Sequence, residues 1–225
     1  GKSKAVEKLA ASGPILCEYE VKPILTDYGI AVGQERLVQS ADEAVALAKE
    51  FGGPVALKIQ SPDILHKTEA GGLALNLNGE EAVRDGYDKV IAAATEQTHG
   101  VLIQAMAPRG HEMIIGINFD ATFGPMLMLG FGGIHVEITP DVAFSPVPLD
   151  RVGATGLLNR LAGRAILDGV RGAPPADVDA LVDLVVKLSE FASDHGDYIA
   201  ELDLNPVLVH EQGVSVVDAL LVKRT

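Results

Sequence analysis

Polar residues near the C-terminus have the types and the spacing of ligands for a divalent cation. Glu201, Asp203 and Asn205 alternate with leucines along one predicted strand, so the period of two points the three polar side chains to one face. Asp218 follows in an apolar run predicted to be the next strand, where an isolated buried carboxylate would be costly. A Mg²⁺ ion held by oxygen ligands beside substrate phosphates would offset that cost. The alternative is a solvated sheet face, which suits Glu201 best.

A lysine and a glycine-containing loop upstream have the chemistry of a phosphate site. Lys58 lies near the end of a predicted strand, where it could contact a phosphate as a point charge or extend from the strand end into water. The loop over 60–72 contains His66 and ends in Gly71 and Gly72, whose backbone N–H groups can approach an anion closely. Taken alone, a lone loop histidine such as His66 is more often an ordinary surface residue.

Two further segments admit a functional and a structural interpretation. Glu112 begins a predicted strand, where it could accept hydrogen bonds from ribose hydroxyls or lie exposed in solvent. Four glycines within the segment 124–133 indicate a tight backbone passage beside a ligand, or a bulged strand and turn. The chain contains neither G-x-x-x-x-G-K-[ST] nor G-x-G-x-x-G, so neither a P-loop nor a Rossmann dinucleotide site is supported.

Composition excludes several functional classes. The 225 residues carry 18 basic and 31 acidic side chains, a net charge of −13, which argues against a general nucleic-acid binder. No Trp is present and aromatic residues are 4%, so stacking on single-stranded nucleic acid is not expected either. The single cysteine, Cys17, favours a cytoplasmic protein. Neither a signal peptide nor an apolar run of the ~18 residues that a membrane helix needs is visible.

The elements that must position these residues alternate without a regular βαβ rhythm. Short turns join several neighbouring strands, which predicts an α+β protein with mixed, largely antiparallel sheets. Long helices are expected over 80–98 and 177–192. A terminal hairpin is expected from strands over 198–204 and 207–209, followed by 214–220. Residues 1–17 are weakly patterned and are predicted to be a linker or a frayed N-terminal helix.

Together these motifs resemble the ATP-grasp signature of the beta subunit of ADP-forming acyl-CoA synthetases of the acetyl-CoA synthetase type. The similarity rests on four ordered segments and covers residues 18–222; succinyl-CoA synthetase beta subunits are more distant relatives of the same layout. The matching segments are 19–30, 54–72, 112–133 and 201–206, the last with an Asp in the following strand.

The resemblance implies an ATP-grasp fold, in which two α+β lobes close on ATP. By analogy the ATP-grasp domain covers 18–225, with a small lobe of about 33–106 and a large lobe made of 18–32 plus 107–225. It implies ATP and Mg²⁺ as cofactors. The implied binding roles are phosphate contact for Lys58, Gly71 and Gly72, adenine recognition through the backbone of Gln104, Ala105 and Met106, ribose binding for Glu112, and Mg²⁺ coordination for Asn205 and Asp218.

The resemblance also implies a catalytic role for His66. In this family the loop histidine carries a phosphoryl group between sites, and a second histidine belongs to a CoA-binding partner. Asp203 matches an acid near the phosphohistidine, where it would orient the ring and favour the imidazolium that forms. Lys58 and Mg²⁺ would offset charge on the transferring phosphoryl group while the neutral imidazole attacks in line.

The expected protein is therefore the nucleotide-binding half of an ADP-forming acyl-CoA synthetase, an acid–thiol ligase that is incomplete without a CoA-binding, alpha-type subunit or fused domain. ATP, a carboxylic acid and CoA would be the substrates of the whole assembly. One alternative is a regulatory or scaffolding module of an acetyltransferase fusion, which degraded site residues would favour. Another is a carboxylate–amine ligase, against which the His66 loop argues.

Overall fold

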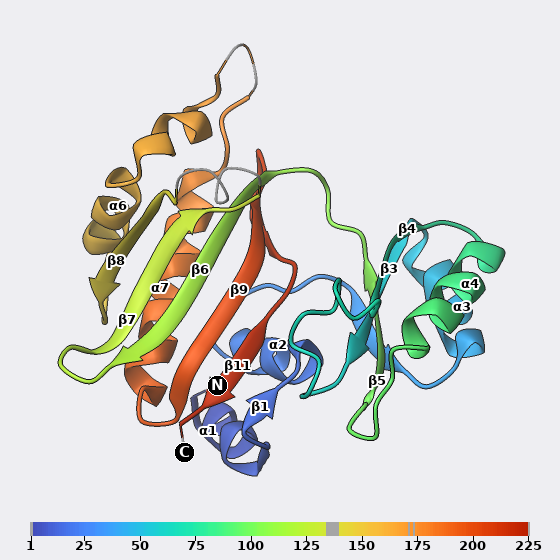
Figure 1. Ribbon diagram of the computed structural model, residues 1–225. Helices are drawn as coiled ribbons and strands as arrows, with labels where there is room; N and C mark the ends of the chain where they lie inside the picture. The colour runs from blue at the N-terminus through green and yellow to red at the C-terminus, as the bar shows by residue number, and fades with distance from the viewer. Residues whose placement is uncertain (1, 134–139, 171, 173, 225) are drawn as a thin grey trace. The chain divides into compact units, whose positions relative to one another are not determined.

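The computed structural model describes residues 2–133, 140–170, 172 and 174–224 and divides the chain into two compact units (Figure 1). Unit 1 comprises Gly1–Leu16, Glu20–Val32 and Pro108–Thr225, and unit 2 comprises Cys17–Tyr19 and Gly33–Ala107. Unit 2 spans the range predicted for the small lobe and includes Cys17–Tyr19 and Ala107 in addition. None of the described helices is long and apolar enough to cross a membrane.

Unit 1 is built on an antiparallel sheet of seven described strands. Its order is β1-β11-β9-β6-β7-β8, with β10 also paired to β9. The strands are β1 (Ile15–Leu16), β6 (His111–Asp120), β7 (Gly124–Phe131), β8 (Val142–Pro146), β9 (Ile199–Val209), β10 (Val214–Val216) and β11 (Leu220–Lys223). This arrangement agrees with the α+β fold and the antiparallel pairing expected from the sequence.

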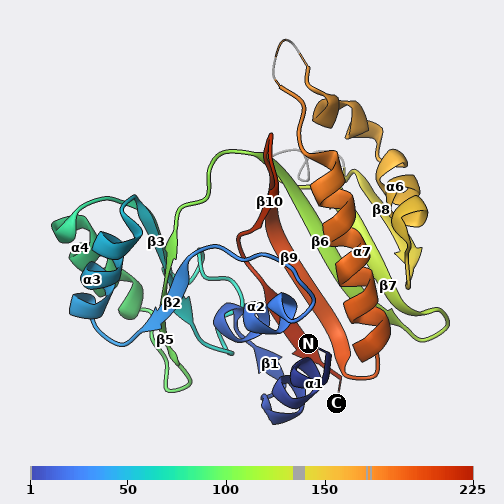
Figure 2. The same cartoon turned by 180° about the vertical axis from the view of Figure 1, so that it is seen from behind.

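Helix α7 (Val178–His195) lies against one face of this sheet, as Figure 2 shows. Its apolar side chains, among them Leu188 and Phe191, are buried in one cluster with side chains from the strands. Ile115 of β6 and Leu204 of β9 belong to that cluster, so alternate residues of both strands must point to the opposite face. Unit 1 also contains α1 (Lys2–Ala11), most of α2 (Glu18–Thr26), α6 (Arg151–Asn159) and the 3₁₀ helix η1 (Ala162–Asp168).

Unit 2 is a four-stranded antiparallel sheet of order β2-β5-β3-β4 with two helices packed on one face (Figure 1). The core between them holds Leu57 and Ile59 of β3 together with Val83 and Tyr87 of the second helix. The elements are β2 (Glu35–Val38), α3 (Ala41–Phe51), β3 (Val55–Gln60), β4 (Leu73–Leu77), α4 (Glu80–Ile91) and β5 (Gly100–Ala105).

The N-terminal segment differs from the expectation of a linker or frayed helix over 1–17. Helix α1 is formed, and its Ala5 and Leu9, one turn apart, are fully buried in the core of unit 1. Leu16 then pairs with Leu221 of β11 in the sheet. Two apolar residues are a weak periodic signal, and burial against the sheet, rather than helix propensity, fixes this segment.

Helix α4 is shorter than the 80–98 predicted from its apolar spacing. The helix ends at Ile91. Beyond it, the N–H of Thr95 donates to the Thr98 hydroxyl at 2.8 Å, and the Thr95 hydroxyl accepts from the N–H of Gln97 at 3.2 Å. Threonine side chains that bond nearby backbone groups compete with helix continuation. The predicted helix 177–192, by contrast, is present as α7.

The start of α7 generates a testable prediction about stability and pH. The Asp177 carboxylate accepts from the N–H of Ala180 at 3.0 Å and of Gly213 at 2.7 Å, and these bonds hold its pKa below the usual range. We expect Asp177→Ala to lower the free energy of unfolding by about 1 kcal/mol at pH 7. Because the folded pKa is depressed, this stabilisation is present above the unfolded pKa of about 3.9 and is lost as pH falls through the folded value.

Urea unfolding of Asp177→Ala and the parent chain at pH 7 and near pH 3 measures this effect. Asp197→Ala removes an exposed acid from the same unit and serves as the matched control. A difference between Asp177→Ala and the parent that is as large near pH 3 as at pH 7 would contradict the assignment.

Candidate active site

Strand β9 carries the acidic cluster and is continuous where the sequence suggests a turn. The predicted hairpin between 198–204 and 207–209 is wrong: β9 runs from Ile199 to Val209, and the chain reverses after it, at Gly213, to form β10. Both halves of β9 pair with β6, which holds the strand together through Asn205 and Pro206. Asp203 and Asn205 therefore stay on one strand, on the face opposite the core.

Pro206 decides where Asp218 lies. Proline has no N–H to donate to a neighbouring strand, and the partner of β9 is interrupted at this point into β10 and β11. The sequence predicts Asp218 within a strand, but in the structure Asp218 lies in that interruption, outside both strands. The pairing register is the same on both sides, with Val216 opposite Val207 and Leu220 opposite Asp203, so Asp218 lies opposite Asn205.

The electrostatics of this cluster fit a cation. Burial raises the pKa of the Asp203 carboxyl, and the neighbouring Glu201 and Asp218 carboxylates raise it further. The Asp218 carboxylate accepts from Ala219 N–H at 2.9 Å, which fixes one of its oxygens. Carboxylate and amide oxygens are the ligands that Mg²⁺ prefers, and a cation bound here would stabilise the ionised form of Asp203.

Glu112 lies on the same face of the unit 1 sheet, next to a turn of glycines. Gly132 N–H donates to the Glu112 carbonyl at 2.8 Å, and a Cβ placed on Gly133 would lie 2.9 Å from the Glu112 carboxylate. Gly133 also has φ +71°, which favours glycine. These residues line a pocket of about 260 Å³ with Phe131 and Ile166. The glycine-rich segment is thus a regular strand, β7, followed by a close backbone approach to an exposed acid.

Lys58 is buried inside unit 2, contrary to the alternative of a lysine extending from a strand end. It lies on β3, an interior strand, and points away from the helix-covered face. Its ammonium is 2.8 Å from the carboxylate of Glu18, and both side chains are almost completely inaccessible, at 3% and 0% exposure. A buried cation needs such a partner, because leaving the charge unpaired away from water is costly.

His66 lies exposed on a loop whose base is tightly closed. Ile59 N–H donates to the Gly72 carbonyl at 2.8 Å, and Gly72 N–H donates to the Lys67 carbonyl at 2.8 Å. Gly71 has φ +75°, so the turn that precedes this closure uses a left-handed residue. The loop therefore presents His66 to solvent from a base that is fixed in the sheet.

The predicted adenine hinge lies at the end of β5, and two of its backbone N–H groups already donate hydrogen bonds within the protein. Ala105 N–H donates to the Gln34 carbonyl at 2.9 Å, and Met106 N–H donates to the Pro54 carbonyl at 3.0 Å. The Gln104 side chain donates to Glu35 at 3.0 Å. Contacts from this segment to a base therefore have to use groups other than these two N–H donors.

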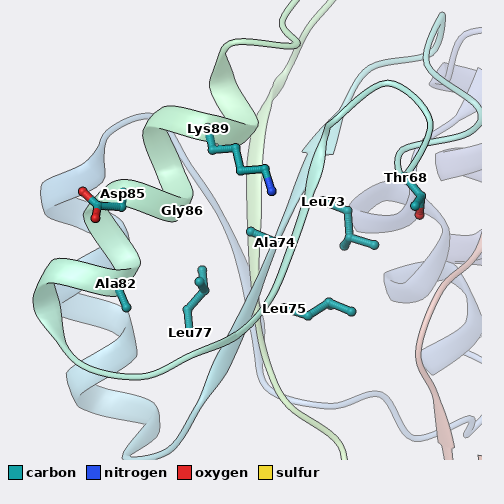
Figure 3. A pocket seen from close by; sticks show the side chains of 9 residues that line it. All are labelled: Thr68, Leu73, Ala74, Leu75, Leu77, Ala82, Asp85, Gly86 and Lys89. Carbon is teal, nitrogen blue, oxygen red and sulfur yellow. The ribbon is translucent and has the colours of Figure 1, made fainter.

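A further pocket of about 580 Å³ lies between β4 and α4 of unit 2. Figure 3 shows its mostly apolar lining, with Leu73, Leu75 and Leu77 on the strand and Lys89 reaching across from the helix. Thr68 is the lining residue that comes from the His66 loop. None of the residues predicted to bind ATP or Mg²⁺ lines this pocket.

In unit 1 the structure brings several of the predicted residues together. Unit 1 gathers Asp203, Asn205 and Asp218 at one point of the sheet, with Glu112 on the same face. In unit 2 the structure adds an acid that sequence reasoning missed, Glu18, which contacts Lys58. Its signal in the sequence was an acid at the start of an amphipathic helix, which is easily taken for an ordinary capping residue.

Comparison with protein-family models gives the class of this chain. Residues 7–222 match the model of the ATP-grasp domain. A structure of a Pyrococcus horikoshii protein superposes with a TM-score of 0.93 and 37% identity, covering 100% of this chain and 99% of the other. The two antiparallel sheets described above are therefore those of an ATP-grasp domain, as the sequence predicted.

Curated relatives narrow the class to a family. The chain is 40% identical to the beta subunit of acetate–CoA ligase [ADP-forming] II of Pyrococcus furiosus, over 97% of this chain and 96% of that subunit. It is 39% identical to acetate–CoA ligase [ADP-forming] I of Archaeoglobus fulgidus, over 96% of this chain but 32% of that longer protein. The chain belongs to the family of ATP-grasp beta subunits and domains of ADP-forming acyl-CoA synthetases.

Two structures of an acetyl-coenzyme A synthetase from Ca. Korarchaeum cryptofilum match the whole chain with TM-scores of 0.85. The first, 35% identical, holds coenzyme A, acetyl-coenzyme A and a phosphorylated phosphohistidine segment in a site I orientation. The second, 37% identical, holds coenzyme A and Mg-AMPPCP, with the phosphohistidine segment pointing towards the nucleotide binding site.

The closed base of the His66 loop generates a prediction. A Cβ added at Gly72 would lie 2.3 Å from Cγ2 and 3.0 Å from Cβ of Ile59, a buried, β-branched side chain that cannot rotate away. We expect Gly72→Ala to lower the free energy of unfolding of unit 2 by about 1–3 kcal/mol through overpacking. Thermal or urea unfolding measures the change.

Gly53→Ala is the matched control, because a Cβ at Gly53 has open space around it and the residue has no left-handed φ. Equal stability of the Gly72→Ala and Gly53→Ala variants would show that the approach of Gly72 to Ile59 does not fix the loop.

Proposed function

We propose that this chain is the nucleotide-binding half of an ADP-forming acyl-CoA synthetase, in which it binds Mg·ATP and passes the γ-phosphoryl group to a histidine. The observation that carries the proposal is the exposed His66 on a loop with a fixed base, in a chain similar to proteins with a phosphohistidine segment. The acid cluster of unit 1 and the buried Lys58 of unit 2 supply the charges that such a reaction requires.

Each predicted residue has a proposed role in binding. Asn205 and Asp218 would hold Mg²⁺, which when bound offsets negative charge on the phosphates. Lys58 would contact the phosphates as a fixed cation, with the Gly71 and Gly72 backbone nearby in the chain. Glu112 would accept hydrogen bonds from the ribose hydroxyls, and the segment Gln104–Met106 would contact the adenine through its remaining backbone groups.

The proposed transfer makes one bond and breaks one. A neutral ring nitrogen of His66 attacks the γ-phosphorus, the N–P bond forms, the bond from that phosphorus to the β,γ-bridging oxygen breaks, and ADP leaves. The ring then carries a positive charge, which a carboxylate such as Asp203 would stabilise. In the second half of the reaction the phosphoryl group passes to the other half of the assembly, and the imidazole is regenerated.

The second half of the reaction requires a partner. Relatives of this chain occur both as separate beta subunits and as about a third of a single longer chain. We infer that a CoA-binding, alpha-type subunit or fused domain carries CoA and the carboxylic acid, giving acyl-CoA, ADP and phosphate as products. We also infer a cytoplasmic location, in keeping with a single cysteine and with these substrates.

The alternatives are less well supported. A regulatory module of an acetyltransferase fusion would be free to lose the buried Lys58 pair and the cluster around Asp218, yet both are intact. A carboxylate–amine ligase would have no use for an exposed loop histidine. A phosphohistidine on this chain would therefore separate the proposed function from both.

Nucleotide binding is tested by calorimetric titration of the chain with Mg·ATP. We expect binding by the parent chain, and a loss of at least about tenfold in affinity in Lys58→Ala and in Asp218→Ala, since each removes a charge contact worth roughly 1.5–3 kcal/mol. Lys49→Ala is the matched control, because Lys49 is an exposed lysine on α3 paired with Glu80. Unchanged affinity in both site variants would refute the assignment of the site.

Phosphoryl transfer is tested by incubation with ATP labelled in the γ-phosphate. We expect label on the chain that is stable to base and labile to acid, and its complete loss in His66→Asn. His210→Asn is the control, because His210 is bound to Ser215 at 2.8 Å in the β9–β10 turn. Label that survives in His66→Asn would exclude His66 as the acceptor even if Mg·ATP binds.

A further inference from the structure

One carboxylate in unit 2 contacts two lysines from different segments. Glu18 Oε1 lies 2.8 Å from the Lys58 ammonium on β3, and Glu18 Oε2 lies 3.8 Å from the Lys67 ammonium in the His66 loop. The Glu18 side chain is 0% exposed, and Lys67 is 15% exposed although it lies in a surface loop. Because burial reduces screening by water, the second contact holds the loop lysine more strongly than its length alone would indicate.

The rest of the loop is fastened at its two ends. At the far end Gly72 is closed onto Ile59 by the hydrogen bond described above. At the near end the Asp63 carboxylate accepts from the hydroxyls of Ser61 and Thr95, the latter at 3.0 Å, and these bonds lower the pKa of Asp63. His66 lies between the two fastenings, and Lys67 next to it reaches back to Glu18.

We propose that Glu18 is a positioning residue that tethers the His66 loop through Lys67 to the strand carrying Lys58, and that the tether is released when negative charge arrives at His66. The proposal rests on the function proposed above for its second part only. A phosphoryl group carries a charge of about −1.5 to −2 at neutral pH and would compete with the single charge of Glu18 for Lys67. Lys58, held 1 Å closer, would keep Glu18 in place.

Such a tether gives the phosphohistidine segment two states with a physical difference between them. In the Korarchaeum structures this segment points towards the nucleotide site in one case and lies in the site I orientation, phosphorylated, in the other. In the present chain the Lys67–Glu18 contact would favour the unphosphorylated position. A ligand or modification shifts the equilibrium between two positions of the segment only if it interacts differently with each of them. The competition between Glu18 and the phosphoryl group for Lys67 would supply that difference.

A purely structural role for Glu18 predicts a different behaviour. If Glu18 only neutralises the buried Lys58, then loss of the Lys67–Glu18 contact leaves loop opening unchanged. Lys67→Met keeps the length of the side chain, removes the charge and leaves the Glu18–Lys58 pair intact, so it separates the two roles. Glu18→Gln is the complementary variant, and Glu69→Gln, an exposed acid in the same loop, is the matched control.

The experiment is amide hydrogen exchange on the ligand-free chain, resolved at single residues by NMR. Ala70 and Gly71 N–H groups donate within the loop, to the carbonyls of His66 and Thr68. In Lys67→Met we expect the protons of these two amides to exchange about two- to fivefold faster than in the parent and in the Glu69→Gln control, because one ion pair is lost. The Ile59 amide, which closes the base of the loop, should keep its protection in both and reports that the fold is intact.

Glu18→Gln, which removes the contact to Lys58 as well, should also accelerate exchange of these amides. The double variant with Lys67→Met should not exceed the faster single variant, because both changes remove the same Lys67–Glu18 contact. Unchanged exchange at Ala70 and Gly71 in Lys67→Met would overturn the tether, whatever the result for Glu18→Gln. The release is measured by adding Mg·ATP, which should accelerate these amides in the parent but not in Lys67→Met. If Lys67→Met exchanges faster than the parent without ligand, but Mg·ATP does not change the exchange rates of the parent, the proposed release is wrong. The tether itself would then still be supported.

Discussion

The two-residue period of antiparallel strands is the constraint from which the chemistry of unit 1 follows. Once α7 buries Leu202 and Leu204 of β9 on one face, the residues between them have to lie on the other. A shift of one residue would place Asp203 in the core and a leucine in the site. The same hydrophobic burial that stabilises the fold therefore also fixes on which face of the sheet the oxygens of Asp203 and Asn205 lie.

Local backbone chemistry then refines what the alternation allows. Pro206 cannot donate to the next strand, and the break it leaves holds Asp218 opposite Asn205. The missing side chain of Gly72 lets the loop base close onto Ile59, and that of Gly133 leaves room beside Glu112. Proline and glycine both weaken a regular strand. Here the proline creates an interruption in the neighbouring strand, and the two glycines leave space for close contacts.

The burial of charged side chains, nearly complete for Lys58 and Glu18 in unit 2 and partial for Asp203 and Asp218 in unit 1, is the second organising feature. In unit 2 the carboxylate of Glu18 contacts Lys58 and Lys67, and in unit 1 burial, with the charges of Glu201 and Asp218, raises the pKa of Asp203. Both arrangements cost free energy in the isolated chain, and both become favourable when the opposite charge of a phosphate or a cation is added. This is the electrostatic preparation that phosphoryl transfer needs.

The sequence alone was enough for the family, the α+β class and the alternation of Glu201, Asp203 and Asn205, because motifs and periodicity are local properties of the chain. It was not enough for the helix at Lys2–Ala11, the end of α4 at Ile91 or the continuous β9, since burial, threonine hydroxyls and pairing with β6 decide these. Glu18 could be assigned only from the tertiary structure. Its partner Lys58 is forty residues away in the chain, and nothing in either local pattern shows that folding will bury the two charges against each other.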